Sequence, residues 1–121
     1  SSKVHDSLVV QNYYDEDINY QVHYDKKQNT ANLPVKVKTE YDNVSKMVII
    51  TFPADSISDI TGQILFFNPF SEYSDVKYDF DLGKDNVYRI PTDKVKAGRW
   101  RLKIDWKRGN TSYYQEEELI I

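Results

Sequence analysis

The chain of 121 residues contains no cysteine. Disulfide bridges, thiolate zinc sites, iron–sulfur ligation and a cysteine nucleophile are therefore excluded. A chain of this length buries about two-thirds of the surface that its unfolded form exposes. A hydrophobic core can thus hold the fold without covalent cross-links.

Glycine is also scarce, with four residues in the chain. They are too far apart to build a Gly-rich phosphate-binding loop, and no Gly-x-Ser-x-Gly turn presents a nucleophilic serine. Ser, His and Asp side chains are present, but their spacing matches no catalytic arrangement. We therefore expect a protein that is not an enzyme and that needs no cofactor. The four glycines are Gly62, Gly83, Gly98 and Gly109.

Neither a long apolar run nor an excess of positive charge is present. The printed sequence has no stretch of about 18 apolar residues that could cross a membrane. Sixteen basic and nineteen acidic side chains give a net charge of −3, which argues against nucleic acid as a partner. The chain begins Ser1-Ser2-Lys3 without methionine, so we expect a processed start from which an N-terminal membrane anchor has been removed.

Residues 6–33 lack both glycine and proline and carry apolar side chains at intervals of three to four residues. This spacing predicts an amphipathic helix of about twenty residues. Asp6 or Ser7 can cap its start, and Lys26 and Lys27 complement the dipole near its end. Pro34 stops it, because the residue before a proline avoids helical torsions.

From Pro34 onward the apolar period is two, which predicts strands. Turn residues recur about every ten positions, as is typical of an antiparallel β-sandwich. We predict a mainly β protein: an antiparallel immunoglobulin-like sandwich of about seven strands, preceded by one long N-terminal α-helix. Residues 1–33 would form the helical arm and residues 34–121 the sandwich. The expected strands are 35–41, 47–52, 63–67, 76–82, 87–90, 99–107 and 111–121.

The last hairpin has the clearest alternation. Trp100, Leu102, Ile104 and Trp106 share one side of the strand, which we place in the core. The unbroken apolar run 47–52 predicts a central strand that is covered on both faces. The predicted core residues are Tyr13, Val48, Ile50, Phe66, Tyr78, Phe80, Trp100, Leu102, Ile104 and Trp106.

Two histidines and one methionine are too few for a metal site. His5 and His23 are eighteen residues apart and cannot grip one ion together, and Met47 lies inside an apolar strand. We interpret both histidines as surface residues and expect no metal ligand.

Asp79, Asp81 and Asp85 surround Gly83 in a pattern that faintly resembles a calcium loop. The glycine occupies the fifth position, where an oxygen donor is needed, and Ile90 occupies the twelfth. We interpret the first two aspartates as the wet face of a strand.

Acidic residues 116–118 lie on the last strand. We expect them to pair with Arg101 or Lys103 across the hairpin and to discourage edge-to-edge association. A catalytic carboxylate pair would need a positioned partner and a cleft, and the sequence indicates neither.

Tyrosines are concentrated on the predicted helix. We favour a stripe that packs the helix on the sandwich, since an amphipathic helix must first bury its apolar side. The alternative is a surface that faces a partner, because tyrosine is enriched at interfaces. Both can hold on different sides of the helix, as Tyr13 and Tyr14 point about 100° apart. The candidate partner-contact residues are Tyr14, Tyr20, Tyr24, Arg99, Arg101 and Lys103.

The order of these motifs resembles the FixH family, also called CcoH, in the form typical of the Bacteroidota. The helix supplies Tyr13-Tyr14, Tyr20-Gln21, Asp25 and Asn29. The hairpin supplies Gly98-Arg99-Trp100, the alternating run to Trp106, and Tyr113-Tyr114.

The resemblance implies a single N-terminal transmembrane anchor and a domain on the periplasmic face of the inner membrane. It also implies an accessory role in the assembly or stability of cytochrome cbb3 oxidase, without catalysis. The expected partners are oxidase subunits or a copper-transporting P-type ATPase. The family brings no catalytic residue to these positions.

Two alternatives stay open from the residues alone. One is a ligand-binding sandwich that stacks carbohydrate on Trp100, Trp106 or surface tyrosines. The other is a periplasmic copper carrier.

Overall fold

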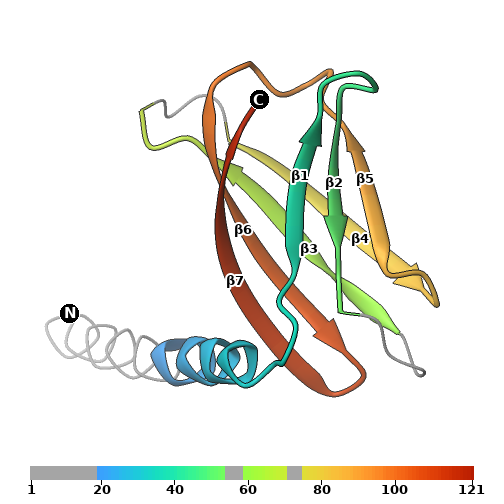
Figure 1. Ribbon diagram of the computed structural model, residues 1–121. Helices are drawn as coiled ribbons and strands as arrows, with labels where there is room; N and C mark the ends of the chain where they lie inside the picture. The colour runs from blue at the N-terminus through green and yellow to red at the C-terminus, as the bar shows by residue number, and fades with distance from the viewer. Residues whose placement is uncertain (1–18, 54–58, 71–74) are drawn as a thin grey trace, which may run out of the picture.

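Seven strands form two antiparallel sheets in the computed structural model, which describes residues 19–53, 59–70 and 75–121 (Figure 1). The predicted roles of Tyr13, Tyr14 and His5 lie outside the described residues. The strands are β1 (Lys38–Asp42), β2 (Met47–Thr51), β3 (Ile60–Phe67), β4 (Val76–Gly83), β5 (Val87–Pro91), β6 (Arg99–Arg108) and β7 (Thr111–Ile120).

The strand order is β1-β2-β5 in one sheet and β4-β3-β6-β7 in the other. The two sheets face each other across one core, so the predicted antiparallel sandwich is confirmed. In the seven-strand constant immunoglobulin arrangement the fourth strand pairs with the fifth. Here β4 pairs with β3 instead, which widens the sheet that contains the final hairpin.

The helix occupies residues 19–31 in the described part of the chain. Its end is capped by the Lys36 ammonium, which donates to the carbonyls of Thr30, Ala31 and Leu33 at 2.6, 2.9 and 2.7 Å. Carbonyls at a helix end lack helical N–H partners, and a cation also complements the negative end of the dipole. The Thr30 carbonyl additionally accepts from the Leu33 N–H at 3.1 Å.

The segment after Pro34 does not extend into a strand as early as its alternation predicts. Val35 is 60% exposed, and β1 begins only at Lys38. The expectation of a strand from residue 35 was wrong, because Lys36 is engaged with the helix end and holds the chain out of sheet pairing.

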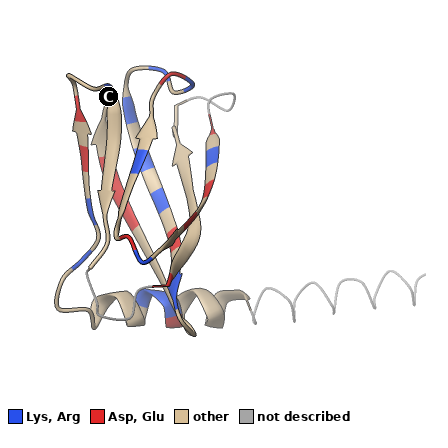
Figure 2. Ribbon diagram, turned by 90° about the vertical axis from the view of Figure 1, so that its right-hand side faces the viewer, with Lys and Arg blue, Asp and Glu red and all other residues tan. Residues whose placement is uncertain are grey.

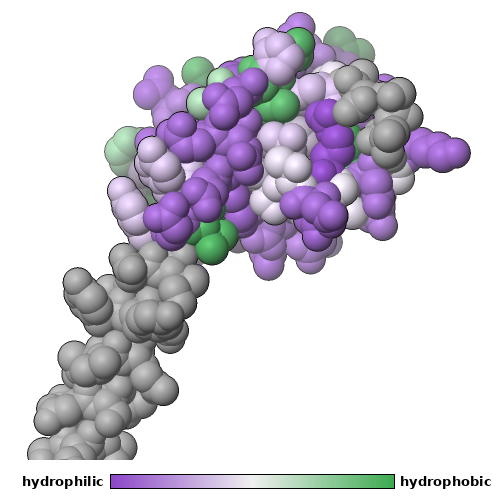
Figure 3. All heavy atoms as spheres, turned by 90° about the horizontal axis from the view of Figure 1, so that it is seen from below, coloured by the Kyte–Doolittle hydropathy of each residue, from purple (hydrophilic) through white to green (hydrophobic). Residues whose placement is uncertain are grey.

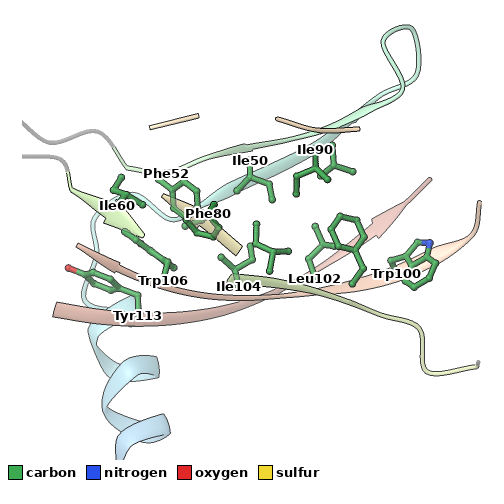
Figure 4. Packing of buried hydrophobic residues seen from close by; sticks show 14 of the residues in the cluster. Ile50, Phe52, Ile60, Phe80, Ile90, Trp100, Leu102, Ile104, Trp106 and Tyr113 are labelled. Carbon is green, nitrogen blue, oxygen red and sulfur yellow. The ribbon is translucent and has the colours of Figure 1, made fainter. Parts of the chain in front are cut away.

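The core is built mainly from the inward residues of β2, β3 and β6 (Figure 4). Trp100, Leu102, Ile104 and Trp106 are at most 1% exposed, as their alternation predicts. The Phe52 ring lies 5.0 Å from that of Trp106, in an edge-on arrangement that aromatic pairs prefer. The other predicted core residues Val48, Ile50, Phe66 and Phe80 are buried, and Tyr78 is half-buried against the cluster.

The apolar run 47–52 is covered on one face and not on both. Val48 and Ile50 are fully buried, whereas Met47 and Ile49 lie on the outer side and are half-buried by their own neighbours. The prediction of a doubly covered strand was wrong. In the described structure β2 is central in its sheet, but no third layer packs on it (Figure 1).

The turns account for the aspartates that resemble a calcium loop. The Asp81 carboxylate accepts from the Gly83 N–H at 3.2 Å, and Asp85 accepts from the N–H groups of Asn86 and Val87 at 2.8 and 3.2 Å. Aspartates commonly close turns in this way. Asp79 is an exposed strand residue, as expected.

Candidate functional site

The helix docks against the β6–β7 hairpin through polar contacts. Lys26 donates to both carboxylate oxygens of Asp105, at 3.0 and 3.1 Å, from the neighbouring strand face. Both side chains are partly shielded, at 22% and 33% exposure. This ion pair fixes the middle of the helix to the outer face of β6.

The next turn of the helix caps the free edge of β7. Gly98 and Ile121 exchange both of their backbone hydrogen bonds, so alternate residues of β7 turn their backbone groups away from β6. Ser112 and Tyr114 are two such residues. The Thr30 hydroxyl accepts from the Tyr114 N–H at 2.9 Å, and the Asn29 amide donates to the Ser112 carbonyl at 2.9 Å.

An aromatic contact completes the docking surface. The His23 and Tyr114 rings lie 4.4 Å apart and are tilted by 58°. The Tyr114 hydroxyl donates to Glu116 at 2.7 Å. The pKa of Tyr114 is raised above its usual value, mainly because the phenol is partly buried and also because it is bonded to this carboxylate. His23 was expected on the surface, but it is half-buried because the helix turns this side toward the hairpin.

The tyrosines of the described helix point away from the sandwich. Tyr20 and Tyr24 are 70% and 48% exposed, and their rings stack at 6.5 Å. The preferred interpretation of a tyrosine stripe that docks the helix was therefore wrong for these two residues. The helix docks instead through polar residues, because β6 and β7 present charged and backbone polar groups to it. These residues are His23, Lys26, Asn29 and Thr30.

The basic residues of β6 differ in how far they are available to a partner. Arg99 is exposed, whereas Arg101 forms an ion pair with Glu118 at 3.3 Å and approaches Glu116 at 3.9 Å. The predicted pairing across the hairpin is thus confirmed for Arg101. The Lys103 ammonium lies 4.3 Å from the centre of the Phe67 ring. Of the three basic contact residues predicted on β6, Arg99 is the most exposed.

Charge on the described surface is interspersed and not gathered into one patch (Figure 2). Seen from the helix side, the described surface is largely hydrophilic with small, separate apolar areas (Figure 3). Within residues 19–53, 59–70 and 75–121, no three His, Cys, Asp or Glu side chains are arranged to hold a metal ion. Trp100 and Trp106 are buried, so they cannot serve as stacking platforms for carbohydrate.

Two residues that the sequence reasoning missed join the helical arm to the sandwich. The Gln115 amide accepts from the Val37 N–H at 3.2 Å and donates to the Val37 carbonyl at 2.8 Å. A polar residue at an inward position of β7 was the available signal, because buried polar side chains need partners. The second is Lys36, whose role depends on a chain reversal that no local pattern shows.

The described residues define an immunoglobulin-like β-sandwich domain with a helix docked on its last hairpin. The FixH family model matches residues 1–120. The chain therefore belongs to the FixH family, which in general comprises non-catalytic accessory proteins. No curated protein and no solved structure matches the chain. In the described part of the chain, no helix has both the length and the apolar character needed to cross a membrane.

Proposed function

We propose that this protein assists the assembly or stability of cytochrome cbb3 oxidase, as a periplasmic domain held at the inner membrane by an N-terminal anchor. The observation that carries this proposal is the FixH match across residues 1–120. Its partners would be oxidase subunits or the copper-transporting P-type ATPase that accompanies them. The protein would act by contact and would not transfer electrons itself.

The free side of the helix is the best-supported contact surface. Docking uses His23, Lys26, Asn29 and Thr30, which leaves the stacked pair Tyr20 and Tyr24 facing solvent. Exposed tyrosines offer a large amphipathic area with few rotatable bonds, so ordering them on binding costs little. The polar docking keeps this pair presented in a defined direction.

Arg99 extends the proposed contact surface onto the sandwich. Its side chain is exposed on β6, whereas Arg101 and Lys103 are already engaged within the sheet. A partner with acidic groups would meet Arg99 first and would have to compete with Glu118 for Arg101. We therefore rank Arg99 above Arg101 and Lys103 as a contact.

An anchor would make a weak contact sufficient. Confinement to the same membrane as the partner raises the effective concentration of the domain. A contact made by two or three side chains can then keep a substantial fraction of the domain bound. This agrees with the view from the helix side, in which the described surface shows only small, separate apolar areas (Figure 3).

Site-specific photo-crosslinking of the full-length protein in its native membrane tests the proposal. A photoreactive residue at Tyr20 or Tyr24 is expected to capture an oxidase or copper-ATPase subunit. The same probe at Lys94, an exposed residue of the β5–β6 loop, is the matched control and should capture neither. Failure to recover any of these subunits from the helix positions would overturn the proposal.

A functional readout separates contact from folding. The double change Tyr20→Ser and Tyr24→Ser should lower the amount of assembled oxidase while leaving the melting temperature of the domain unchanged. The control Lys94→Ser should change neither quantity. Normal oxidase levels in the double variant would show that the tyrosine pair is not the contact.

A further inference from the structure

The outer face of the three-stranded sheet carries an apolar centre between opposite charges. Alternation along β2 turns Val48 and Ile50 into the core and leaves Met47 and Ile49 on the outer side. None of the described elements lies over this face (Figure 1). The face therefore offers a partner a short, partly exposed apolar strip formed by Met47 and Ile49.

The strand register places three of these side chains in one row. Ile49 pairs with Glu40 on β1 and with Arg89 on β5. An acid and a base therefore flank the central isoleucine at the same level, one on each side. Both charged residues are exposed, and neither forms an ion pair with another residue of the described structure.

The remaining rows leave the face with no net charge. Lys38 pairs with Thr51, and Asp42 pairs with Met47. Two basic and two acidic side chains cancel on this face, so neither a strongly acidic nor a strongly basic partner is favoured. A partner that itself carries an acid and a base on opposite sides of an apolar strip fits better.

We propose that this face binds a second copy of the same face. In this dimer a twofold axis runs parallel to β2 in the plane of the interface, so Ile49 of one copy lies opposite Ile49 of the other. The same rotation exchanges the β1 and β5 sides, so Glu40 of each copy faces Arg89 of the other. Packed sheets lie about 10 Å apart, a gap that a glutamate and an arginine together can span.

The charges also select between the two possible arrangements. A twofold axis across the strands would place Glu40 on Glu40 and Arg89 on Arg89, which is repulsive. That arrangement also brings Lys38 of each copy opposite Asp42 of the other, but it keeps the two like-charged contacts beside Ile49. The axis along the strands forms two attractive Glu40–Arg89 pairs without a like-charged contact. A symmetric dimer uses one patch on both subunits, so a pair between two different residues, such as Glu40 with Arg89, occurs twice.

The size of the face sets the strength of the dimer. Three strands of five residues cover about 10 by 17 Å, so the buried area falls below the roughly 1,200 Å² that stable complexes reach. We therefore expect a weak dimer that forms only at high protein concentration. A common membrane would raise its occupancy.

Sedimentation equilibrium of the purified chain up to about 1 mM measures this association. Glu40→Arg should weaken the dimer about tenfold, because each interface then carries two like-charged pairs. Arg89→Glu alone should do the same. The combined exchange Glu40→Arg with Arg89→Glu should restore the original dissociation constant within about twofold, since the pairs are re-formed in reverse.

A matched control makes the result specific. Asp79→Arg introduces the same change of charge on the exposed face of β4, in the other sheet, and should leave the dimer unchanged. Circular dichroism melting of all variants separates a lost interface from a lost fold. A chain that stays monomeric at 1 mM, or a dimer that Glu40→Arg does not weaken, overturns the proposal.

Discussion

The side chain of Gln115 pairs with both backbone groups of Val37, as a neighbouring strand would do. Its oxygen accepts from the Val37 N–H at 3.2 Å, and its nitrogen donates to the Val37 carbonyl at 2.8 Å. Both residues are buried. This side chain therefore ties the segment after the helix to β7, which belongs to the opposite sheet.

Replacing Gln115 by Leu should destabilise the domain by about 2 kcal/mol, because two buried backbone groups lose their partners. Urea unfolding followed by circular dichroism measures the change. Gln63→Leu, an exposed glutamine on β3, is the control and should change stability by less than about 0.5 kcal/mol. Equal stability of the two variants would contradict the role assigned to Gln115.

Gly62 lies where β3 pairs closely with β6, directly opposite Trp106. A Cβ atom here would collide with the Asp105 carbonyl oxygen and lie 2.7 Å from the Trp106 Cα. Both are backbone atoms, which cannot rotate away. Gly62→Ala should therefore cost about 2–3 kcal/mol in the free energy of unfolding.

Thr61→Ala is the matched control for Gly62→Ala, since Thr61 is the adjacent residue and is half-exposed. Thermal melting of both variants gives the comparison. A melting temperature of Gly62→Ala within 1–2 °C of the parent would show that the strands move apart more easily than the packing implies.

Thr30→Val removes the oxygen that accepts from the Tyr114 N–H while it keeps the shape of the side chain. We expect a loss of about 1 kcal/mol and faster hydrogen exchange at the Tyr114 amide. Lys27→Ala, at an exposed position three residues earlier, is the control. Unchanged exchange at Tyr114 in Thr30→Val would mean that the helix does not protect this edge.

Removing the ion pair should have a smaller effect. Lys26→Ala separates the helix from Asp105, but both groups are partly solvated, so we expect about 0.5 kcal/mol. The effect should shrink at high salt, because screening weakens the pair. Hydrogen exchange across residues 19–31, measured at low and high salt, tests this.

Tyr114 predicts a loss of stability in alkaline solution. Burial raises its pKa in the folded state above the usual 10.0. The folded form thus favours the protonated phenol. The stability that this preference contributes is fully present below pH 10 and is lost progressively as the pH rises from 10 toward the higher pKa of the folded state. Urea unfolding between pH 9 and 11 should show a shallower decline for Tyr114→Phe. Parallel declines would contradict the shift.

The alternation of β6 illustrates what the sequence predicts well. Trp100 and Trp106 are buried as their two-residue period indicates, since successive side chains of any strand point to opposite sides. The helix shows the opposite case. The period of the helix predicts two sides, but not which of them packs on the sandwich. That depends on the groups that β6 and β7 present. The side that packs carries His23, Lys26, Asn29 and Thr30, and the tyrosines lie on the other side.

Met47 and Ile49 show a second limit. In the sequence, an apolar run looks the same whether another layer of the fold covers its outer face or a second copy of the chain binds there. The residue types do not show what lies against the outer face of the sheet. Here the described structure covers only the side of Val48 and Ile50.

By itself the sequence determined the number of strands, the inward side of β6 and the end of the helix, because these follow from torsions and side-chain directions within a few residues. Only the tertiary structure decided that β4 joins β3, that Gln115 holds Val37, and that Glu40 and Arg89 flank Ile49. These relationships join segments far apart in the chain. Their free energy comes from register and packing across that distance, which no local pattern encodes.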